Sequence, residues 1–330
     1  MNKIAFFDTK PYDEVWFNKL KEQYGVQIKY FEAKLGPDTS VMAKGCQGVV
    51  AFVNDDLSEE TIDSLVEQGI GAVALRCAGY NNVNLKHAEG KLRVFTVPAY
   101  SPNAVAEHAM ALLLCLNRKI HRAYNRVREY NFSIKGLIGF DLKGKTIGVV
   151  GTGRIGQEFI EICKGFRMKV IACDPYPVEM DGVEYVELEE LFRESDVIAL
   201  HCPLTVQNYH MINKKTLGMM KDGVYIINTS RGALINAEAL LDAIKTGKVA
   251  GAGLDVYEEE SDLFFEDASD LTIHDDVLKL LLSTPNVLIT SHQAFFTEEA
   301  LSSIAEVTLQ NLRDYFDGNE NKNEVIYKGK

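Results

Sequence analysis

Apolar residues occur along this chain in short runs of strand length, separated by segments with helical periodicity. In the first hundred residues the strand-like runs are KIAFFDT (3–9), GVVAFV (48–53), AVALRC (72–77) and LRVFTVP (92–98). Six more runs follow from residue 145: KTIGVVG, MKVIACD, DVIALHC, GVYIINT, VAGAGLD and NVLITSH. Runs this apolar suit strands that are buried on both faces, as in a parallel sheet covered by helices. The pattern therefore predicts an α/β protein with two doubly wound parallel sheets.

Two longer helical patterns flank the second series of strands. The first starts at Ser101-Pro102, because proline suits the first turn of a helix, and its apolar residues recur at helical spacing to Leu116. We expect this helix to face another domain or another subunit. The last helix, residues 297–318, is amphipathic, and a polar tail follows it. Residues 258–276 are acidic without a clear period, which predicts a long surface loop.

Composition narrows the class of protein. The 330 residues are 46% hydrophobic and 25% charged, which is ordinary for globular domains and long enough for two of them. The 35 Lys and Arg against 47 Asp and Glu give a net charge of −12 without a basic block, which argues against nucleic-acid binding. The longest mid-chain apolar run, Ala109–Leu116, is far short of the roughly 20 residues that span a bilayer.

The N-terminus and the cysteines bear on the compartment. The first residues carry too brief an apolar stretch and too many charges for a secretory signal. The six cysteines are dispersed without a CxxC pair, which is typical of reduced, buried thiols rather than of disulfides or zinc ligands. We therefore expect a cytoplasmic protein without a metal site, a membrane partner or a nucleic-acid partner.

One glycine-rich turn has the context of a phosphate-binding site. It follows a predicted strand, opens a predicted helix and reads Gly151-Thr152-Gly153-Arg154-Ile155-Gly156. In a GxGxxG turn the glycines permit a tight bend and close backbone approach to a pyrophosphate, which the helix N-terminus attracts. Asp174 ends the next strand, where a carboxylate can accept both ribose hydroxyls and repel a 2′-phosphate. The turn predicts binding of NAD in preference to NADP, although a purely structural glycine turn is the alternative.

Polar or otherwise unusual residues end the predicted strands. In the second series they are Gly151, Asp174, His201-Cys202-Pro203, Asn228-Thr229-Ser230-Arg231, Asp255 and Ser291-His292. In the first series they are Asn54-Asp55, Ala78-Gly79 and Ala99-Tyr100. The carboxyl ends of parallel strands share one edge of a sheet, which is where ligands bind. We expect two such edges to line a cleft.

Four residues near these strand ends can carry chemistry. Arg231 has the planar fork that binds a carboxylate in bidentate fashion. His292 ends a predicted buried strand and can exchange a proton near neutral pH, and Glu260 could orient its imidazole and hold it protonated. Asp255 could support this site or face the nicotinamide. Taken singly, each of these residues could instead have only a structural role.

The same segments, in this order, resemble the D-isomer-specific 2-hydroxyacid dehydrogenase family. The matching stretches are VVGTGRIGQ, CDPYP, LHCPLT, INTSRGALIN, GLDVYE, SHQAFFTEEAL, ALRCAGYNNVNL and VPAYSPNAVAEHA. Together they cover essentially the whole chain. The stretches DLFFEDASD, AFVNDD and LNRKIHRAYNR are most similar to the fermentative D-lactate dehydrogenase branch.

The resemblance implies a domain arrangement. A flavodoxin-like substrate domain would comprise residues 1–100 and 298–330, and a Rossmann-type NAD-binding domain would be inserted at residues 101–297. Hinges would lie near Tyr100 and residues 294–297. The chain ends soon after the last predicted helix, so we expect no appended regulatory domain.

The resemblance also assigns roles by position. Arg231 would bind the substrate carboxylate or carbonyl, His292 would donate a proton to the carbonyl oxygen, and Glu260 would pair with His292. Ala78 and Gly79 would offer backbone N–H groups to the carboxylate, and Tyr100 would pack against the substrate. Besides the glycine turn, the residues implied to contact NAD are Arg154, Ile155, Asp174, Cys202, Pro203, Asn208, Thr229, Ser230, Arg231 and Asp255.

The expected activity is reversible reduction of pyruvate to D-lactate by NADH. Phe52, Tyr100, Phe295 and Phe296 could crowd the site and favour a methyl group, or the phenylalanines could simply belong to the core. A larger substrate, such as 2-oxoisocaproate or phenylpyruvate, therefore stays open. Outside enzymology, the chain could be a non-catalytic NAD-sensing module, or a structural protein with an idle nucleotide pocket. The resemblance also implies a homo-oligomer, dimer or tetramer, formed through residues 101–130.

Overall fold

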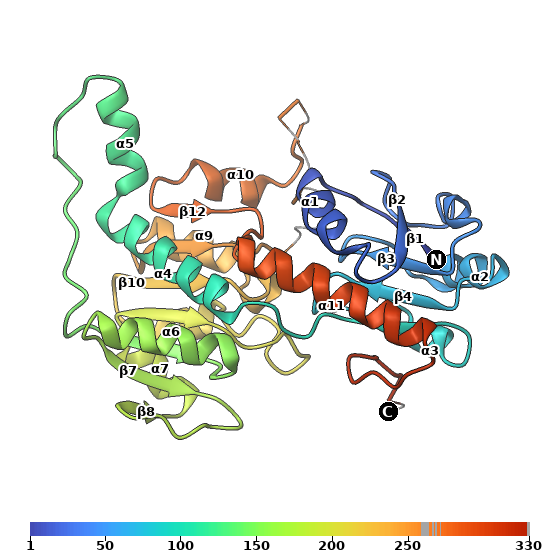
Figure 1. The fold of residues 1–330 in the computed structure, drawn as a ribbon. Coiled ribbons are helices and arrows are strands. Elements are labelled where there is room, and N and C mark those ends of the chain that lie inside the picture. The colour runs from blue at the N-terminus through green and yellow to red at the C-terminus, as the bar shows by residue number, and fades with distance from the viewer. Residues whose placement is uncertain (259–263, 266, 268, 271, 329–330) are drawn as a thin grey trace. The chain divides into compact units, whose positions relative to one another are not determined.

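The computed structural model describes residues 1–258, 264–265, 267, 269–270 and 272–328 (Figure 1). Contacts divide the chain into two compact units. Unit 1 comprises Met1–Ser101 and Phe296–Lys330, and unit 2 comprises Pro102–Phe295. The sequence of unit 2 is thus inserted between the two segments that form unit 1.

Unit 1 contains a five-stranded sheet in which every pair of neighbouring strands is parallel. Its strands are β1 (Asn2–Phe6), β2 (Val26–Tyr30), β3 (Gly48–Ala51), β4 (Ala72–Leu75) and β5 (Arg93–Phe95). They lie in the order β2-β1-β3-β4-β5, which is the flavodoxin-like order.

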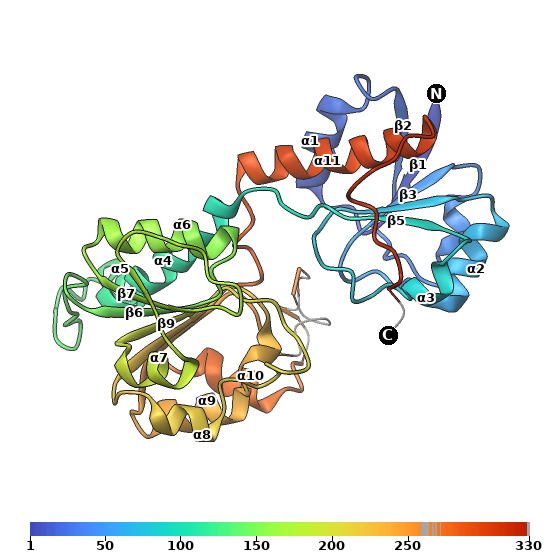
Figure 2. The ribbon, with the colours of Figure 1, turned by 90° about the horizontal axis from the view of Figure 1, so that it is seen from below.

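Helices cover both faces of this sheet (Figure 2). Successive strand residues point to opposite faces, so each strand contributes to two cores. Ile4 and Phe6 pack in the core shared with α1 (Pro11–Leu20) and α11 (Glu298–Phe316). Ala5 and Phe7 pack in the opposite core, whose helices are η1 (Ser40–Ala43), α2 (Glu59–Glu67) and α3 (Leu85–Ala88).

Unit 2 contains a seven-stranded parallel sheet. Its strands are β6 (Thr146–Val150), β7 (Lys169–Cys173), β8 (Val183–Tyr185), β9 (Val197–Leu200), β10 (Val224–Asn228), β11 (Val249–Leu254) and β12 (Val287–Ile289). The order β12-β11-β10-β9-β6-β7-β8 is the Rossmann order with one added strand, so the predicted α/β fold is confirmed. The pattern of apolar runs did not predict β8, because this strand has three residues and none of them is fully buried.

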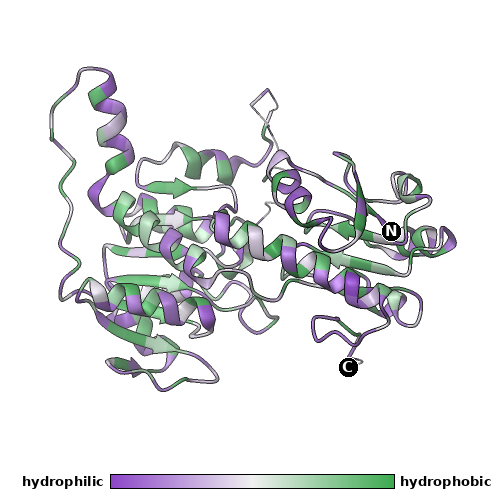
Figure 3. Cartoon of the chain, viewed as in Figure 1, coloured by the Kyte–Doolittle hydropathy of each residue, from purple (hydrophilic) through white to green (hydrophobic). Residues whose placement is uncertain are grey.

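The helices of unit 2 again form two layers. One core contains residues of α4 (Pro102–Arg118) and α6 (Arg154–Gly165). The other contains residues of α7 (Leu188–Glu194), α9 (Ala237–Lys245) and α10 (Asp276–Ser283), together with α8 (Lys214–Met219) and η2 (Gly232–Leu234). Figure 3 shows that the strands are mostly hydrophobic, whereas the helices carry hydrophilic residues as well.

The helix predicted to start at Ser101-Pro102 is confirmed as α4, and a second helix follows it after one residue. Lys119, with φ of +51°, separates α4 from α5 (Ile120–Arg128), which Figure 1 shows projecting from the end of α4. The apolar face of α4 is buried inside unit 2 against α6 and β11. By contrast, α5 has no buried residue.

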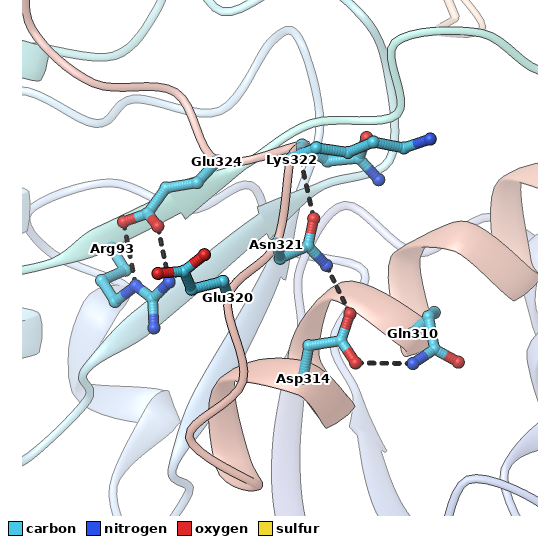
Figure 4. Close-up of a pocket in the computed structure, with 8 residues that line it drawn as sticks. Arg93, Gln310, Asp314, Glu320, Asn321, Lys322 and Glu324 are labelled. Atoms are coloured by element: carbon cyan, nitrogen blue, oxygen red, sulfur yellow. Dashed lines mark hydrogen bonds and ion pairs between the residues drawn. The ribbon is translucent and has the colours of Figure 1, made fainter.

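The C-terminal segment is less free than its polar sequence predicted. It returns along β5, where the Thr96 N–H donates to the Asn323 carbonyl (3.1 Å) and the Val325 N–H donates to the Val94 carbonyl (2.8 Å). Arg93 binds the Glu324 carboxylate through two nitrogens. A surface pocket of about 730 Å³ lies at this place. Figure 4 shows the Arg93–Glu324 pair in it and the hydrogen bonds that Asp314 accepts from Gln310 and Asn321. This pocket is a structural junction between the tail, β5 and α11.

The predicted surface loop 258–276 lies partly outside the described residues, and Glu260 is among those not described. Among its described residues, Phe264 is buried in the core of unit 2. The loop therefore contributes at least one side chain to the packed interior.

Candidate active site

The glycine turn after β6 combines tight packing with an open helix end. A side chain at Gly156 would place its Cβ 2.1 Å from the Gly151 carbonyl oxygen, and one at Gly151 would meet the Cys202 nitrogen at 2.7 Å. Around Gly153, in contrast, no described atom lies within 4 Å of an added Cβ. The first and third glycines are thus required for packing, and the second leaves room for a ligand.

The start of α6 fits a dinucleotide phosphate. Gly153 is the N-cap residue, and no described side chain caps the helix there. The first N–H groups of a helix lack intrahelical partners and carry partial positive charge, so they attract an anion. The turn Gly151–Gly156 with Arg154 and Ile155 can therefore hold a pyrophosphate.

Asp174 is fixed beside this turn at the end of β7. Its Oδ2 accepts hydrogen bonds from the Thr152 N–H (2.6 Å) and hydroxyl (3.2 Å), and its Oδ1 accepts from the Tyr176 N–H (2.8 Å). The Tyr185 hydroxyl lies 3.1 Å from the Thr152 hydroxyl. These contacts hold a carboxylate where a ribose bound at the turn can reach it, and its role in binding stays a prediction.

The loop after β9 lies at the same sheet edge. Asn208 donates from Nδ2 to the Pro203 carbonyl (2.7 Å), and the Ser230 hydroxyl donates to the Cys202 carbonyl (2.6 Å). Burial raises the pKa of the Cys202 thiol to about 11, so this thiol is protonated near neutral pH and a poor nucleophile. The structure thus places Cys202, Pro203 and Asn208, three predicted NAD contacts, next to the loop that carries Arg231.

His201 is a buried, neutral imidazole. Both ring nitrogens are buried and have no hydrogen-bond partner among the described residues, and the ring packs 4.7 Å from that of Phe159. Burial lowers the pKa of His201 to about 4. A side chain in this state cannot serve as the proton donor.

Asn228, at the end of β10, holds the loop that carries Arg231. Asn228 is fully buried, accepts from the Ser230 N–H (3.0 Å) and donates to the Arg231 carbonyl (2.9 Å). The Arg231 guanidinium donates to the Ser230 carbonyl (2.8 Å). The buried Thr229 hydroxyl has no hydrogen-bond partner in the described part of the chain, which leaves a polar atom for a ligand. In the sequence, Asn228 is recognisable only as a strand-end residue.

Asp255, at the end of β11, holds the loop that carries His292. Asp255 is fully buried, and its carboxylate accepts from the Gln293 N–H (2.9 Å), the Ala294 N–H (2.8 Å) and the Thr290 hydroxyl (2.5 Å). The His292 N–H donates to the Asp255 carbonyl (2.7 Å). His292 has φ of +52°, a left-handed conformation that non-glycine residues adopt at a cost of about 1–2 kcal/mol. The Asp255 contacts stabilise this conformation.

The two loops are coupled through the sheet. β10, β11 and β12 are neighbours, and the Asp255 N–H donates to the Asn228 carbonyl (2.9 Å). Arg231 follows β10 and His292 follows β12, the two strands that flank β11, so these residues, far apart in sequence, are carried by one edge of the same sheet. Their relative placement does not depend on how the two units sit.

The predicted substrate residues of unit 1 also lie at strand ends. Ala78 and Gly79 follow β4 and are half-buried, as is Tyr100 after β5. Of the phenylalanines, Phe52 and Phe295 are buried, whereas Phe296 is 49% exposed and packs against Tyr12.

A buried arginine precedes the Ala78-Gly79 segment, and sequence reasoning missed it. Arg76 donates to the Asp8 carbonyl (2.8 Å), lies 3.5 Å from the Asp13 carboxylate and stacks 3.7 Å from the Phe52 ring centre. Burial raises the pKa of Asp13, against the opposing charge of Arg76. The signal that could have found Arg76 is a charged residue directly after an apolar run.

Neither a membrane-spanning helix nor a metal-binding cluster occurs among the described residues. None of their helices is long and apolar enough to cross a membrane. They contain no group of three His, Cys, Asp or Glu side chains that could hold a metal ion.

Comparison with known proteins identifies the family. Residues 110–294 match the family described as D-isomer specific 2-hydroxyacid dehydrogenase, NAD binding domain. The chain belongs to the D-isomer-specific 2-hydroxyacid dehydrogenase family and carries its NAD-binding domain.

Individual relatives agree over the full length. The D-lactate dehydrogenase of Escherichia coli (strain K12) is 50% identical over 329 residues, covering 98% of this chain and 100% of the relative. The apo-structure of D-lactate dehydrogenase from Escherichia coli superposes with a TM-score of 0.91 at 48% identity, over 98% of this chain and 100% of that one. A structure of D-2-hydroxyisocaproate dehydrogenase has a TM-score of 0.89 at 34% identity, with the same coverage.

Proposed function

We propose that this protein is an NAD-dependent D-lactate dehydrogenase, which interconverts pyruvate and D-lactate. The observation that carries the proposal is a pair of buried polar residues, Asn228 and Asp255, at the ends of the adjacent strands β10 and β11. Asn228 holds the Arg231 loop, and Asp255 holds the His292 loop. The 50% identity to a D-lactate dehydrogenase over 329 residues supports this choice of substrate.

In this proposal Arg231 and His292 act on one small anion. The Arg231 guanidinium binds the carboxylate of pyruvate through two parallel hydrogen bonds, which fixes the orientation of the substrate. The His292 imidazolium donates its proton to the C2 oxygen, so the negative charge that develops there is neutralised. Bound NADH supplies the hydride that C2 receives. In the direction of oxidation, neutral His292 accepts the hydroxyl proton of D-lactate.

Three other groups complete the proposed site. Glu260, which lies outside the described residues, pairs with His292 and favours its protonated form. The N–H groups of Ala78 and Gly79 bind the substrate carboxylate, and Tyr100 packs against the substrate. These roles rest on the family resemblance of their sequence positions.

The proposed cofactor site is the edge of the unit 2 sheet. The turn with Gly151, Gly153 and Gly156, together with Arg154 and Ile155, binds the pyrophosphate, and Asp174 binds the adenosine ribose. The remaining proposed contacts follow neighbouring strands: Cys202, Pro203, Asn208, Thr229, Ser230, Arg231 and Asp255.

Specificity for pyruvate is tested by comparing kcat/KM for pyruvate, 2-oxoisocaproate and phenylpyruvate with NADH as reductant. We expect pyruvate to give the highest value. Preference for 2-oxoisocaproate is the second candidate, favoured by the likeness to a D-2-hydroxyisocaproate dehydrogenase. If none of the three acids oxidises NADH although NADH binds, the chain is an NAD-sensing module and the proposed activity is wrong.

We also propose a homo-oligomer formed through α5 and the segment after it. On α5 the side chains of Ile120, Tyr124 and Val127 are 54%, 59% and 50% exposed. Large apolar side chains that stay exposed together mark an interaction surface. We expect Val127→Glu to lower the mass measured by light scattering, because a carboxylate opposes burial of that surface. An unchanged mass in the variant contradicts this interface.

We further propose a cytoplasmic location. All six cysteines are free, as expected in a reducing compartment. Cell fractionation tests it, with recovery in a secreted or membrane fraction as the contrary result.

A further inference from the structure

His108, on α4, contacts the pair of residues that holds the His292 loop. Its Nε2 lies 3.0 Å from the Thr290 hydroxyl and 3.4 Å from Asp255 Oδ1. His108 and Thr290 are 182 residues apart in sequence, so this contact depends on the fold. The mechanism above gives His108 no role.

The hydrogen bonds decide which atoms donate. Thr290 has one hydroxyl hydrogen, and the 2.5 Å contact with Asp255 Oδ1 uses it, because a carboxylate can only accept. The Thr290 oxygen must then accept from His108. Nε2 of His108 therefore carries a hydrogen and points it at Thr290 and Asp255.

The backbone of unit 2 brings α4 close enough for this contact. His108, Leu112 and Leu116 lie four residues apart on one face of α4. An added Cβ on Gly253 of β11 would meet both leucines at 3.1 Å, so the missing side chain lets the helix approach the strand. Gly253 and Asp255 are two residues apart, and strand residues at this spacing share a side. One turn of helix before the leucines, His108 meets Asp255.

We propose that His108 is a positioning residue for the proton donor His292. It donates its Nε2 hydrogen to the Thr290–Asp255 pair, and Asp255 in turn fixes the N–H groups of Gln293 and Ala294 and the left-handed backbone of His292. The inference rests on the proposed function, in which His292 protonates the substrate oxygen. When the His108 donor is lost, the Thr290 oxygen no longer accepts a hydrogen bond, and the loop that carries His292 is held less firmly.

Three substitutions at one position separate hydrogen bonding from packing. His108→Leu removes the donor. His108→Gln places an amide donor near the position of Nε2, whereas the shorter side chain of His108→Asn cannot bring its donor to the Thr290 oxygen. We expect His108→Leu to lower kcat for pyruvate reduction about 10- to 100-fold, as a misplacement of the order of 1 Å does. His108→Gln should recover most of the rate and His108→Asn should not, with the NADH dissociation constant unchanged within about twofold.

The control is His87→Leu, which removes an imidazole that contacts a carboxylate, Asp63 at 2.9 Å, on the surface of unit 1. It should leave kcat unchanged. Thr290→Val removes the hydroxyl that links His108 to Asp255. This variant replaces His108→Leu in the test if His108→Leu does not fold.

A second readout does not depend on activity. Amide hydrogen exchange in a peptide covering residues 288–296 should be faster in His108→Leu than in the wild type and normal in His108→Gln. Equal exchange in all three proteins, or equal loss of kcat in the Leu and Gln variants, overturns the positioning role. A wild-type rate in His292→Ala would instead overturn the proposed function, and the exchange data would still decide the role of His108.

Discussion

Gly156 offers a stringent test of the dinucleotide turn. An alanine there would place its Cβ 2.1 Å from the Gly151 carbonyl oxygen and 3.0 Å from the Gly151 carbonyl carbon. Both atoms belong to the backbone, so no side chain can rotate away. The helix must shift from the turn by about 1 Å to restore an ordinary contact, and overpacking of this kind costs about 1–3 kcal/mol of stability.

The same shift moves the N–H groups of α6 away from the phosphate position. We expect Gly156→Ala to raise the NADH dissociation constant at least about tenfold, which corresponds to roughly 1.4 kcal/mol. Titration of NADH fluorescence measures this constant, and thermal unfolding measures the stability.

Gly165 is the matched control, because it ends the same helix and no described atom lies within 4 Å of an added Cβ. Gly165→Ala should keep NADH affinity and gain up to about 1 kcal/mol of stability from helix propensity. Equal NADH affinity in Gly156→Ala and Gly165→Ala would refute the argument that the third glycine shapes a phosphate site.

Two other predictions concern unit 2. Because burial lowers the pKa of His201 from 6.5 to about 4, the folded protein binds fewer protons than the unfolded chain below pH 6.5. Stability present above pH 6.5 should therefore fall by about 3 kcal/mol as the pH drops to 4, and His201→Phe should lose less in urea unfolding; parallel losses contradict the assignment. Asp174→Ala should raise the ratio of kcat/KM for NADPH over NADH at least about tenfold, since the carboxylate repels a 2′-phosphate; an unchanged ratio excludes that role.

Much of the fold was predictable because buried parallel strands are continuous apolar runs. The prediction missed elements that lack this signal. β8 has three residues, none fully buried, and the C-terminal segment is polar yet pairs with β5 through backbone groups. Backbone pairing of this kind leaves little trace in side-chain pattern.

The residues of the candidate site could be predicted from their types and positions. The contacts that hold these residues in place were harder to predict. Arg231 and His292 stand out as charged or titratable residues after apolar runs. The contact of His108 with Thr290 and Asp255 joins segments 182 residues apart, and only the packing of α4 on β11 creates it. Likewise, the turn between α4 and α5 depends on one left-handed residue, Lys119, that the sequence does not mark.

The central claim is that His292 protonates a 2-oxo acid held by Arg231. The most direct test is NADH oxidation by pyruvate with chiral analysis of the product, for the wild type and His292→Ala. We expect one D-lactate for each NADH consumed, and a fall in kcat of about 10²–10⁴-fold in the variant with NADH affinity retained. L-lactate as product, or a variant that turns over at the wild-type rate, would contradict the account.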